Sequence, residues 1–244
     1  MSRGTRMTSF LISNNFINVR WSIDKPDLKE IGTTIGADQG FKDILTCSDE
    51  QVTPKSDKHG HSLQSILETM CRKKKGSKAF KRCQTHRENY INWSINQLNL
   101  ANVKEVRFEE IWNIGFKSKQ SRILSHWTNT IIRDKVEKTC EEGGVLLTHV
   151  SSTYNSQRCN GCGVVRKANR KGKIYTCKRC GHVADADYNA CCNIAMDLPE
   201  VPYELRKLNL NRGKGFLWLE SGFFDLAGGS LESPPPVKPI IVIN

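Results

Sequence analysis

Two C-x2-C pairs, separated by fourteen residues, constrain this chain more than any other feature of its sequence. Each pair can form a tight turn that offers two thiolates to one ion, and the residues between the pairs can form a hairpin. A tetrahedral site of four thiolates has no open position for water, so we expect a structural zinc ribbon in which the metal contributes folding energy. The alternative is a pair of unligated or redox-active C-x-x-C motifs. The predicted zinc ligands are Cys159, Cys162, Cys177 and Cys180.

The remaining cysteines are scattered along the chain, which favours metal ligation in a reducing compartment over a disulfide framework. No stretch approaches the eighteen consecutive apolar residues of a membrane span. We therefore expect a soluble, cytoplasmic protein with no membrane partner.

The charge of the chain predicts a polyanionic partner. Its 244 residues carry a net charge of +12, which favours nucleic acid over an acidic membrane surface. Two clusters of basic residues are expected to bind a phosphate backbone, and the alternative for each is a solvated charged surface. The first cluster comprises Arg72, Lys73, Lys74, Lys75, Lys78, Lys81 and Arg82, and the second Arg166, Lys167, Arg170, Lys171 and Lys173.

The hydrophobic pattern predicts a mixed α/β fold. Apolar pieces within residues 1–32 indicate a hairpin or two edge strands, and residues 33–48 read as strand, turn and strand. Helices are predicted over 62–74, 78–100 and 119–141, and strands over 103–112 and 145–150. A helix follows the cysteine pairs, and the Pro- and Gly-containing residues 199–244 read as a flexible tail. The ribonuclease H-like fold has this order of elements.

Carboxylates mark two strands of the predicted sheet and the helix that follows the cysteine pairs. Asp38 ends a strand, Glu109 and Glu110 lie in a later strand, and Asp185 and Asp187 stand near a helix start. Strand alternation sends Glu109 and Glu110 to opposite faces, so only one can face a shared site. Taken singly, these residues could also be a turn residue, a solvated strand position and a helix cap.

Three motifs together resemble the TnpB (OrfB) proteins of insertion sequences, which are related to the type V CRISPR effector nucleases. The segments "IGADQG" (35–40), "VRFEEI" (106–111) and "DADYNACCNIA" (185–195) resemble the three RuvC motifs of that family. A helix containing Trp127, a strand, "SSTYNSQRCNGCG" and a zinc ribbon stand between the last two motifs, also in the family order. The resemblance covers roughly residues 33–198. Small departures are Ala37, Gln39 and Cys191.

The resemblance implies that Asp38, Glu109 and Asp187 hold two catalytic Mg²⁺ ions about 4 Å apart, whereas Glu110 and Asp185 do not. It implies a ribonuclease H-like (RuvC) mixed sheet with flanking helices and an inserted four-cysteine zinc ribbon. The expected domains are a β remnant of a barrel domain (1–32), a nuclease core (33–155) with basic helices at 62–100, the ribbon (156–184), the third-motif helix (185–198) and a C-terminal tail (199–244).

The implied function is a metal-dependent DNA endonuclease of a mobile-element or CRISPR-related system, with DNA and a guide RNA as partners. Only 37 residues precede Asp38, so we expect no more than the last barrel strands before the first motif. Two alternatives stay open: a nuclease-inactive accessory protein or repressor that binds RNA or DNA, and an unguided structure-specific nuclease. The sequence makes no prediction of the oligomeric state.

Overall fold

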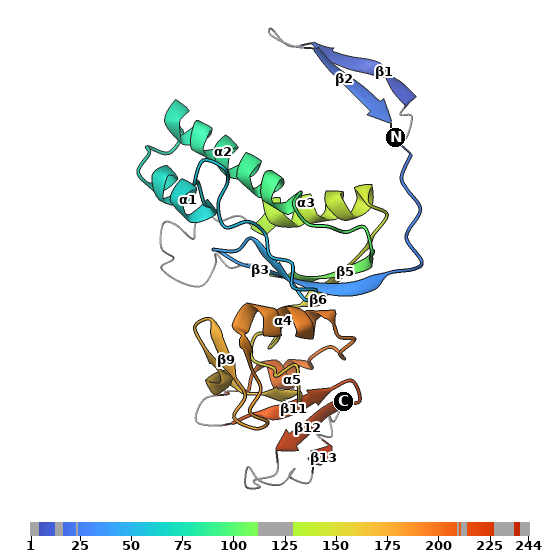
Figure 1. Cartoon of the computed structure of the whole chain (residues 1–244), viewed down its shortest axis with the longest axis vertical. Coiled ribbons are helices and arrows are strands. Elements are labelled where there is room, and N and C mark those ends of the chain that lie inside the picture. The colour runs from blue at the N-terminus through green and yellow to red at the C-terminus, as the bar shows by residue number, and fades with distance from the viewer. Residues whose placement is uncertain are drawn as a thin grey trace.

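A four-stranded mixed sheet with helices on both faces forms the centre of the molecule (Figure 1). The computed structural model describes residues 5–12, 17–22, 24–111, 129–208, 210, 214–226 and 237–239. Within the sheet, whose strand order is β4-β3-β5-β6, β4 runs antiparallel to β3, and β5 and β6 run parallel to it. These strands are β3 (Thr33–Gln39), β4 (Leu45–Cys47), β5 (Val103–Glu110) and β6 (Leu146–Ser151).

Helices cover both faces of this sheet, with those of the crossover connections on one face and the helix after the cysteine pairs on the other (Figure 1). The parallel pairs β3–β5 and β5–β6 require crossover connections. The helices α1 and α2 lie in the connection that leads from β4 to β5, and α3 lies in the connection from β5 to β6. The helices span α1 (Leu63–Cys71), α2 (Lys78–Ile95), α3 (Asn129–Glu142) and, on the opposite face, α4 (Ala186–Ala195). The mixed α/β prediction is confirmed.

The core lies between the sheet and the three helices. Ile35 and Phe108 of the sheet pack with Leu67, Ile91 and Ile132 of the helices, and all five side chains are at most 2% exposed. Ser62 and Ser77 cap α1 and α2, because each side chain accepts a hydrogen bond from a backbone N–H in the first turn. The helix predicted over 119–141 corresponds to α3, and the part of that prediction before residue 129, with Trp127, lies outside the described residues.

Close contact between α4 and β3 depends on Gly36. A Cβ atom at this position would lie 2.1 Å from the backbone oxygen of Cys191 and 2.5 Å from the backbone nitrogen of Ala195. The thiol of Cys191 donates a hydrogen bond to the backbone oxygen of Thr46 in β4, at 2.8 Å. Helix α4 therefore sits directly on the strand that carries Asp38.

The cysteine pairs lie in a second, smaller β region beside α4 (Figure 1). One three-stranded antiparallel sheet has the order β10-β9-β8, and β7 belongs to a separate sheet. The elements of this region are β7 (Val164–Val165), a 3-10 helix at Lys167–Asn169, β8 (Arg170–Lys171), β9 (Ile174–Thr176) and β10 (Val183–Asp185).

The structure differs from the predicted C-terminal tail. After the short helix α5 (Tyr203–Arg206), strand β11 (Phe216–Leu219) pairs with β7, β12 (Gly222–Leu226) with β11, and β13 (Val237–Pro239) with β12. Phe216, Leu217 and Trp218 are buried. The short strand "FLWL" escaped prediction because its stability comes from pairing with a strand fifty residues earlier, at positions such as Phe216↔Val165.

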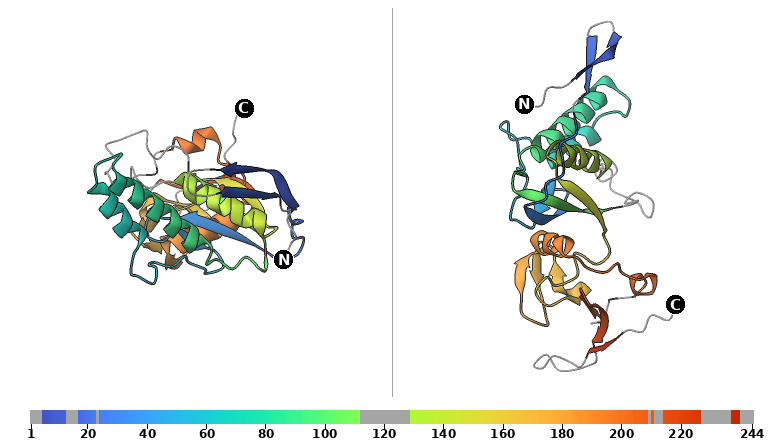
Figure 2. Two further views of the ribbon diagram at one scale, coloured as in Figure 1. Left: turned by 90° about the horizontal axis from the view of Figure 1, so that it is seen from above. Right: turned by 90° about the vertical axis from the view of Figure 1, so that its right-hand side faces the viewer.

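The N-terminal segment forms an antiparallel hairpin of β1 (Thr5–Ile12) and β2 (Ile17–Ser22), as its apolar pieces predict. This hairpin and the C-terminal strands lie at opposite ends of the long axis (Figures 1 and 2). Within the described parts of the chain, none of the helices combines the length and the apolar character needed to cross a bilayer.

Candidate functional site

Asp38, Glu109 and Asp187 line one cavity of about 380 Å³. Asp38 is near the end of β3 and Glu109 near the end of β5, and because these strands are adjacent and parallel, their carboxyl ends meet at one edge of the sheet. Asp187 stands in the first turn of α4, which packs across β3. Three residues far apart in the sequence are therefore brought together by the sheet register and by one helix contact.

The environment of the two strand carboxylates favours their protonated forms. Burial, followed by the nearby charge of Asp187, raises the pKa of Asp38 to about 7. Burial, followed by the charge of Asp38, raises the pKa of Glu109 to about 8. The amide Nδ2 of Asn155 donates hydrogen bonds to Glu109 Oε1 (3.1 Å) and to the Ser151 backbone oxygen (2.8 Å), which fixes the orientation of the Glu109 carboxyl.

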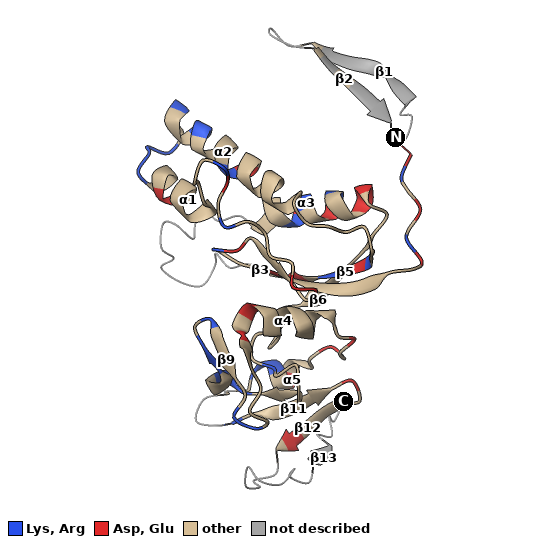
Figure 3. Cartoon of the chain, viewed as in Figure 1, with Lys and Arg blue, Asp and Glu red and all other residues tan. Residues whose placement is uncertain are grey.

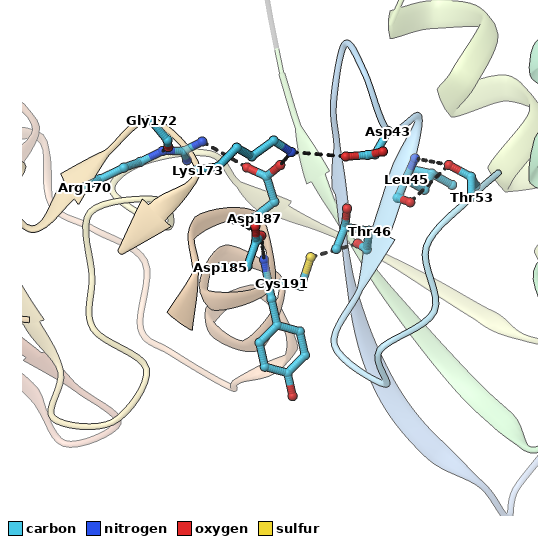
Figure 4. Close-up of polar contacts among 11 residues, drawn as sticks. Asp43, Leu45, Thr46, Thr53, Arg170, Gly172, Lys173, Asp185, Asp187 and Cys191 are labelled. Carbon is cyan, nitrogen blue, oxygen red and sulfur yellow. Dashed lines mark hydrogen bonds and ion pairs between the residues drawn. The ribbon is translucent and has the colours of Figure 1, made fainter. Parts of the chain in front are cut away.

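Asp187 is held by two cations from the β8–β9 hairpin (Figure 4). Arg170 Nη2 lies 2.9 Å from Asp187 Oδ1, and Lys173 Nζ contacts Asp187 Oδ2. The same ammonium group lies 3.1 Å from Asp43 Oδ2, on the loop between β3 and β4. The hairpin thus brings positive charge into the cavity that the carboxylates line.

The neighbouring carboxylates have different surroundings. Asp185 is the N-cap of α4, and its Oδ1 accepts hydrogen bonds from the backbone nitrogens of Asp187 (2.9 Å) and Tyr188 (3.1 Å). Glu110 is more exposed than Glu109, and its Oε1 lies 3.7 Å from His149 Nδ1 of the adjacent strand. Neither Asp185 nor Glu110 lines the cavity that Asp38, Glu109 and Asp187 line.

The donor set of the cavity fits Mg²⁺. Hard divalent cations are bound by carboxylate oxygens, and the cavity gathers carboxylates from Asp38, Asp43, Glu109 and Asp187. Uncompensated burial of such groups is costly, and the raised pKa values of Asp38 and Glu109 express that cost. A divalent cation would offset it.

The four cysteine sulfurs of the C-x2-C pairs form one cluster in which all ligand atoms lie within 4.8 Å of one another. The sulfurs of Cys159 and Cys180 are 3.7 Å apart, and those of Cys162 and Cys177 are 3.6 Å apart. A tetrahedral zinc ion with Zn–S bonds of about 2.3 Å would separate its sulfurs by about 3.8 Å. The cluster therefore fits zinc.

Matching turns build the two halves of the cluster. Gly163 N donates to the backbone oxygen of Cys159 at 2.8 Å, and Gly181 N donates to that of Cys177 at 3.0 Å. Both glycines have positive φ, 72° and 75°, which a side chain would strain. The sequence C-x2-C-G thus fixes each turn locally.

The two predicted basic clusters lie in different parts of the molecule (Figure 3). Those of the first predicted cluster lie at the end of α1, in the α1–α2 connection and in the first turns of α2, and all except the half-buried Lys73 are exposed. In the second cluster Lys167 and Lys171 are exposed, whereas Arg166 and Arg170 are half-buried. Arg170, which was predicted to contact the phosphate backbone of a nucleic acid, instead forms an ion pair with Asp187 in this structure. To bind a phosphate group, it would have to leave Asp187 or share its guanidinium group between the two.

Sequence reasoning missed Asp43 and Asn155, and it placed Lys173 in the basic loop between the cysteine pairs without assigning it to Asp187. The hairpin register that places Lys173 beside Asp187 involves strands of only two and three residues, which leave no periodicity to read. Asn155 belongs to the family-like segment "SSTYNSQRCNGCG", but nothing in the spacing of the residues indicated that its side chain donates a hydrogen bond to Glu109.

Comparison with known proteins agrees with this architecture. The Cas12f1-like TNB domain model matches residues 130–194. A CRISPR-associated endodeoxyribonuclease Cas12f1 of Sulfoacidibacillus thermotolerans is 33% identical over 118 residues, which are 48% of this chain and 27% of that protein. A TnpB-like protein of Aquifex aeolicus is 32% identical over 82 residues, 32% of this chain and 27% of the relative.

The chain is related to the TnpB and type V CRISPR nucleases. Its fold agrees with this relationship: the cryo-EM structure of a Cas12f1–sgRNA–target DNA complex superposes with a TM-score of 0.50 at 18% identity, over 74% of this chain and 42% of that one. The matched part spans about a quarter of the length of the curated relatives. The predicted relationship to TnpB proteins is confirmed.

Proposed function

We propose that this chain is a metal-dependent DNA endonuclease of a CRISPR-related or mobile-element system, with a RuvC-type, ribonuclease H-like catalytic core (33–155 and 185–198) and an inserted zinc ribbon (156–184). The names of the relatives, an endodeoxyribonuclease and a TnpB-like protein, support a nuclease of this kind. The strand order β4-β3-β5-β6, with α4 on the opposite face from α1–α3, supports the ribonuclease H-like assignment. Strands β1 and β2 would belong to a barrel domain.

The observation that carries the proposal is the convergence of Asp38, Glu109 and Asp187 on one cavity, with raised pKa values for the first two. A protein that only binds nucleic acid has no physical need to gather three carboxylates in one cavity. Their cost to stability is intelligible when they serve to hold divalent cations.

In this proposal Asp38, Glu109 and Asp187 would hold two Mg²⁺ ions, which when bound supply activation of water and stabilisation of the leaving oxygen. Asn155 keeps the Glu109 carboxyl oriented toward the cavity. Arg170 and Lys173 place cationic donors at the same cavity, where they can bind the non-bridging oxygens of a phosphodiester as they leave Asp187.

The substrate and partners follow from the charge distribution. A single DNA strand could pass from the exposed basic residues of the α1–α2 connection and the ribbon to the cavity. The structural neighbour was solved with a guide RNA and target DNA, and we propose that a guide RNA supplies sequence specificity to this chain as well. The exposed residues of the two basic clusters are the proposed phosphate contacts, including Lys74, Lys78, Lys81, Lys167 and Lys171.

Cleavage of labelled single-stranded DNA with Mg²⁺ tests the enzymatic claim. The parent should cut, Asp38→Asn and Asp187→Asn should lose at least about a hundredfold in rate, and Glu110→Gln should cut like the parent. The Glu110 variant is the matched control, because it neutralises a carboxylate that is next to Glu109 in the sequence but does not line the cavity. DNA binding with equal, negligible cleavage by all four proteins, with and without copurified RNA, would instead support a binding role.

Sequencing of the copurified RNA tests guidance, and an RNA-free preparation that still cuts would remove the guide from the proposal.

A further inference from the structure

A second cluster of metal-ligating side chains lies outside the cavity and outside the cysteine cluster. Ligand atoms of Asp57, His61 and His86 all lie within 4.8 Å of one another. Asp57 and His61 belong to the loop between β4 and α1, whereas His86 lies in the middle of α2. The imidazole rings of His61 and His86 are 4.9 Å apart, centroid to centroid, and nearly perpendicular.

The carboxylate of Asp57 is fixed in position before any ion arrives. Its Oδ1 accepts hydrogen bonds from the backbone nitrogens of His59 (2.8 Å) and His61 (2.9 Å). The backbone closes the same turn, because Asp57 N donates to the His61 oxygen at 2.9 Å and Gly60 N donates to the Asp57 oxygen at 3.0 Å. Gly60 has a φ of 78°, which glycine adopts freely. One carboxylate oxygen is thus used by the turn, and Oδ2 is left for the imidazoles.

The loop is also held to α2 next to the cluster. The hydroxyl of Tyr90 donates a hydrogen bond to the backbone oxygen of Pro54 at 3.0 Å. Tyr90 lies one helical turn beyond His86, so the start of the loop and the cluster are fixed to neighbouring turns of one helix. At the other end, Ser62 caps α1 immediately after His61. The ligand geometry therefore rests on a restrained loop.

The separation of the ligand atoms suits a tetrahedral ion. Asp57 Oδ2 lies 3.2 Å from His61 Nδ1. With metal–ligand bonds of about 2.0–2.1 Å, two ligands of a tetrahedral zinc ion lie about 3.3 Å apart. Two imidazoles and one carboxylate favour a borderline divalent ion such as Zn²⁺ and do not favour Mg²⁺, which prefers oxygen ligands.

We propose that Asp57, His61 and His86 form a second, exchangeable zinc site that fastens the β4–α1 loop to α2. The side chain of His61 is 49% exposed and that of Asp57 is 19% exposed, so the ion can enter and leave from solvent, unlike an ion enclosed by the four cysteines. Three protein ligands leave a fourth position for water. The site lies at the helix pair that presents the first basic cluster, so zinc occupancy would stiffen the support of that surface.

Zinc stoichiometry tests this site on the full chain, with the cysteine cluster already loaded. Equilibrium dialysis against buffered Zn²⁺, followed by elemental analysis, should give about two zinc ions per chain for the parent. His61→Ala, His86→Ala and Asp57→Asn should each keep only about one, and Asp57→Asn preserves the turn because an amide oxygen still accepts the two backbone hydrogen bonds. His59→Ala is the matched control, since it removes an imidazole from the same loop and should keep about two.

Thermal unfolding provides a second readout that does not depend on counting ions. Added Zn²⁺ should raise the unfolding temperature of the parent and of His59→Ala, and should not raise that of His86→Ala, whereas Mg²⁺ should raise none of them through this site. Retention of the first zinc equivalent by His86→Ala shows that the variant is folded. One zinc ion per chain in the parent, or equal binding by all the histidine variants, would overturn the proposal and leave Asp57 and His61 as a hydrogen-bonded pair.

Discussion

Replacing Asp38 with asparagine should stabilise the metal-free protein while it removes a proposed metal ligand. The pKa of Asp38 is raised from its ordinary value of 3.8 to about 7, chiefly by burial and then by the charge of Asp187. Each pH unit between the native and unfolded pKa corresponds to about 1.4 kcal/mol, so ionising Asp38 in the folded chain costs at most about 4 kcal/mol. The cavity opens to solvent and relaxation is expected, so roughly half of this, about 2 kcal/mol, is the expected gain of Asp38→Asn at alkaline pH.

The pH dependence gives this prediction its sign. A carboxyl whose native pKa is above its unfolded pKa binds protons more tightly in the folded state, so folding stability falls as pH rises between the two values. Well below its ordinary pKa of 3.8, the Asp38 carboxyl is largely protonated in both the folded and the unfolded state and behaves like the amide. The advantage of Asp38→Asn should therefore grow as pH rises from about 4 through about 7 and then level off.

Urea unfolding in Mg²⁺-free buffer, with the cysteine zinc retained, measures this advantage at pH 5.5 and pH 8.5. Asp185→Asn is the control, because asparagine caps a helix about as well as aspartate and Asp185 lies outside the cavity. Excess Mg²⁺ should reverse the order, since only the parent keeps the full set of ligands. Equal stability of parent and Asp38→Asn at both pH values would refute the claim that Asp38 is electrostatically strained.

Three further predictions concern the same elements. Mg²⁺ affinity measured by calorimetry should rise between pH 6 and pH 8.5, because the pKa values of Asp38 and Glu109 are raised by burial and protons must leave before the ion binds; a flat profile would contradict this. Gly36→Ala should destabilise the chain by roughly 1–3 kcal/mol and slow cleavage, because a Cβ there meets the backbone of α4; unchanged urea unfolding would show that α4 is not in close contact. Cys177→Ser should lower the bound zinc by about one ion per chain and the unfolding temperature, whereas Cys140→Ser, at a buried cysteine remote from the cluster, should keep the zinc.

The parts of this molecule that could be predicted from sequence are those fixed by local chemistry. The spacing of the C-x2-C pairs sets the two turns closed by Gly163 and Gly181. The strand ends that carry Asp38 and Glu109 follow from apolar periodicity and strand alternation, and the motif resemblance added the helix that carries Asp187. These features depend on nearest neighbours along the chain, which a sequence displays directly.

The parts that could not be predicted depend on contacts between short, distant segments. Strand β11 is stabilised by its pairing with β7, and neither strand is long enough to show the alternating apolar pattern from which a strand is predicted. Similarly, Lys173 contacts Asp43 from 130 residues away. The buried side chain of Arg158 joins β11 to α4. Its Nε donates a hydrogen bond to the Trp218 backbone oxygen at 2.8 Å, and its Nη1 donates one to Asn193 Oδ1 at 2.6 Å. Such pairings are decided by tertiary packing, which overrides local preference.

The charges around the cavity suggest how the chain tolerates its carboxylates without an ion. Arg170 and Lys173 balance Asp187, while burial keeps protons on Asp38 and Glu109, whose pKa values are raised. A divalent cation would replace the protons and compete with the two side chains for Asp187. Lys173 has a second partner in Asp43 at 3.1 Å, so it can leave Asp187 without losing every ionic contact. Because both cations lie on the β8–β9 hairpin, the position of the ribbon and the occupancy of the carboxylates should depend on each other.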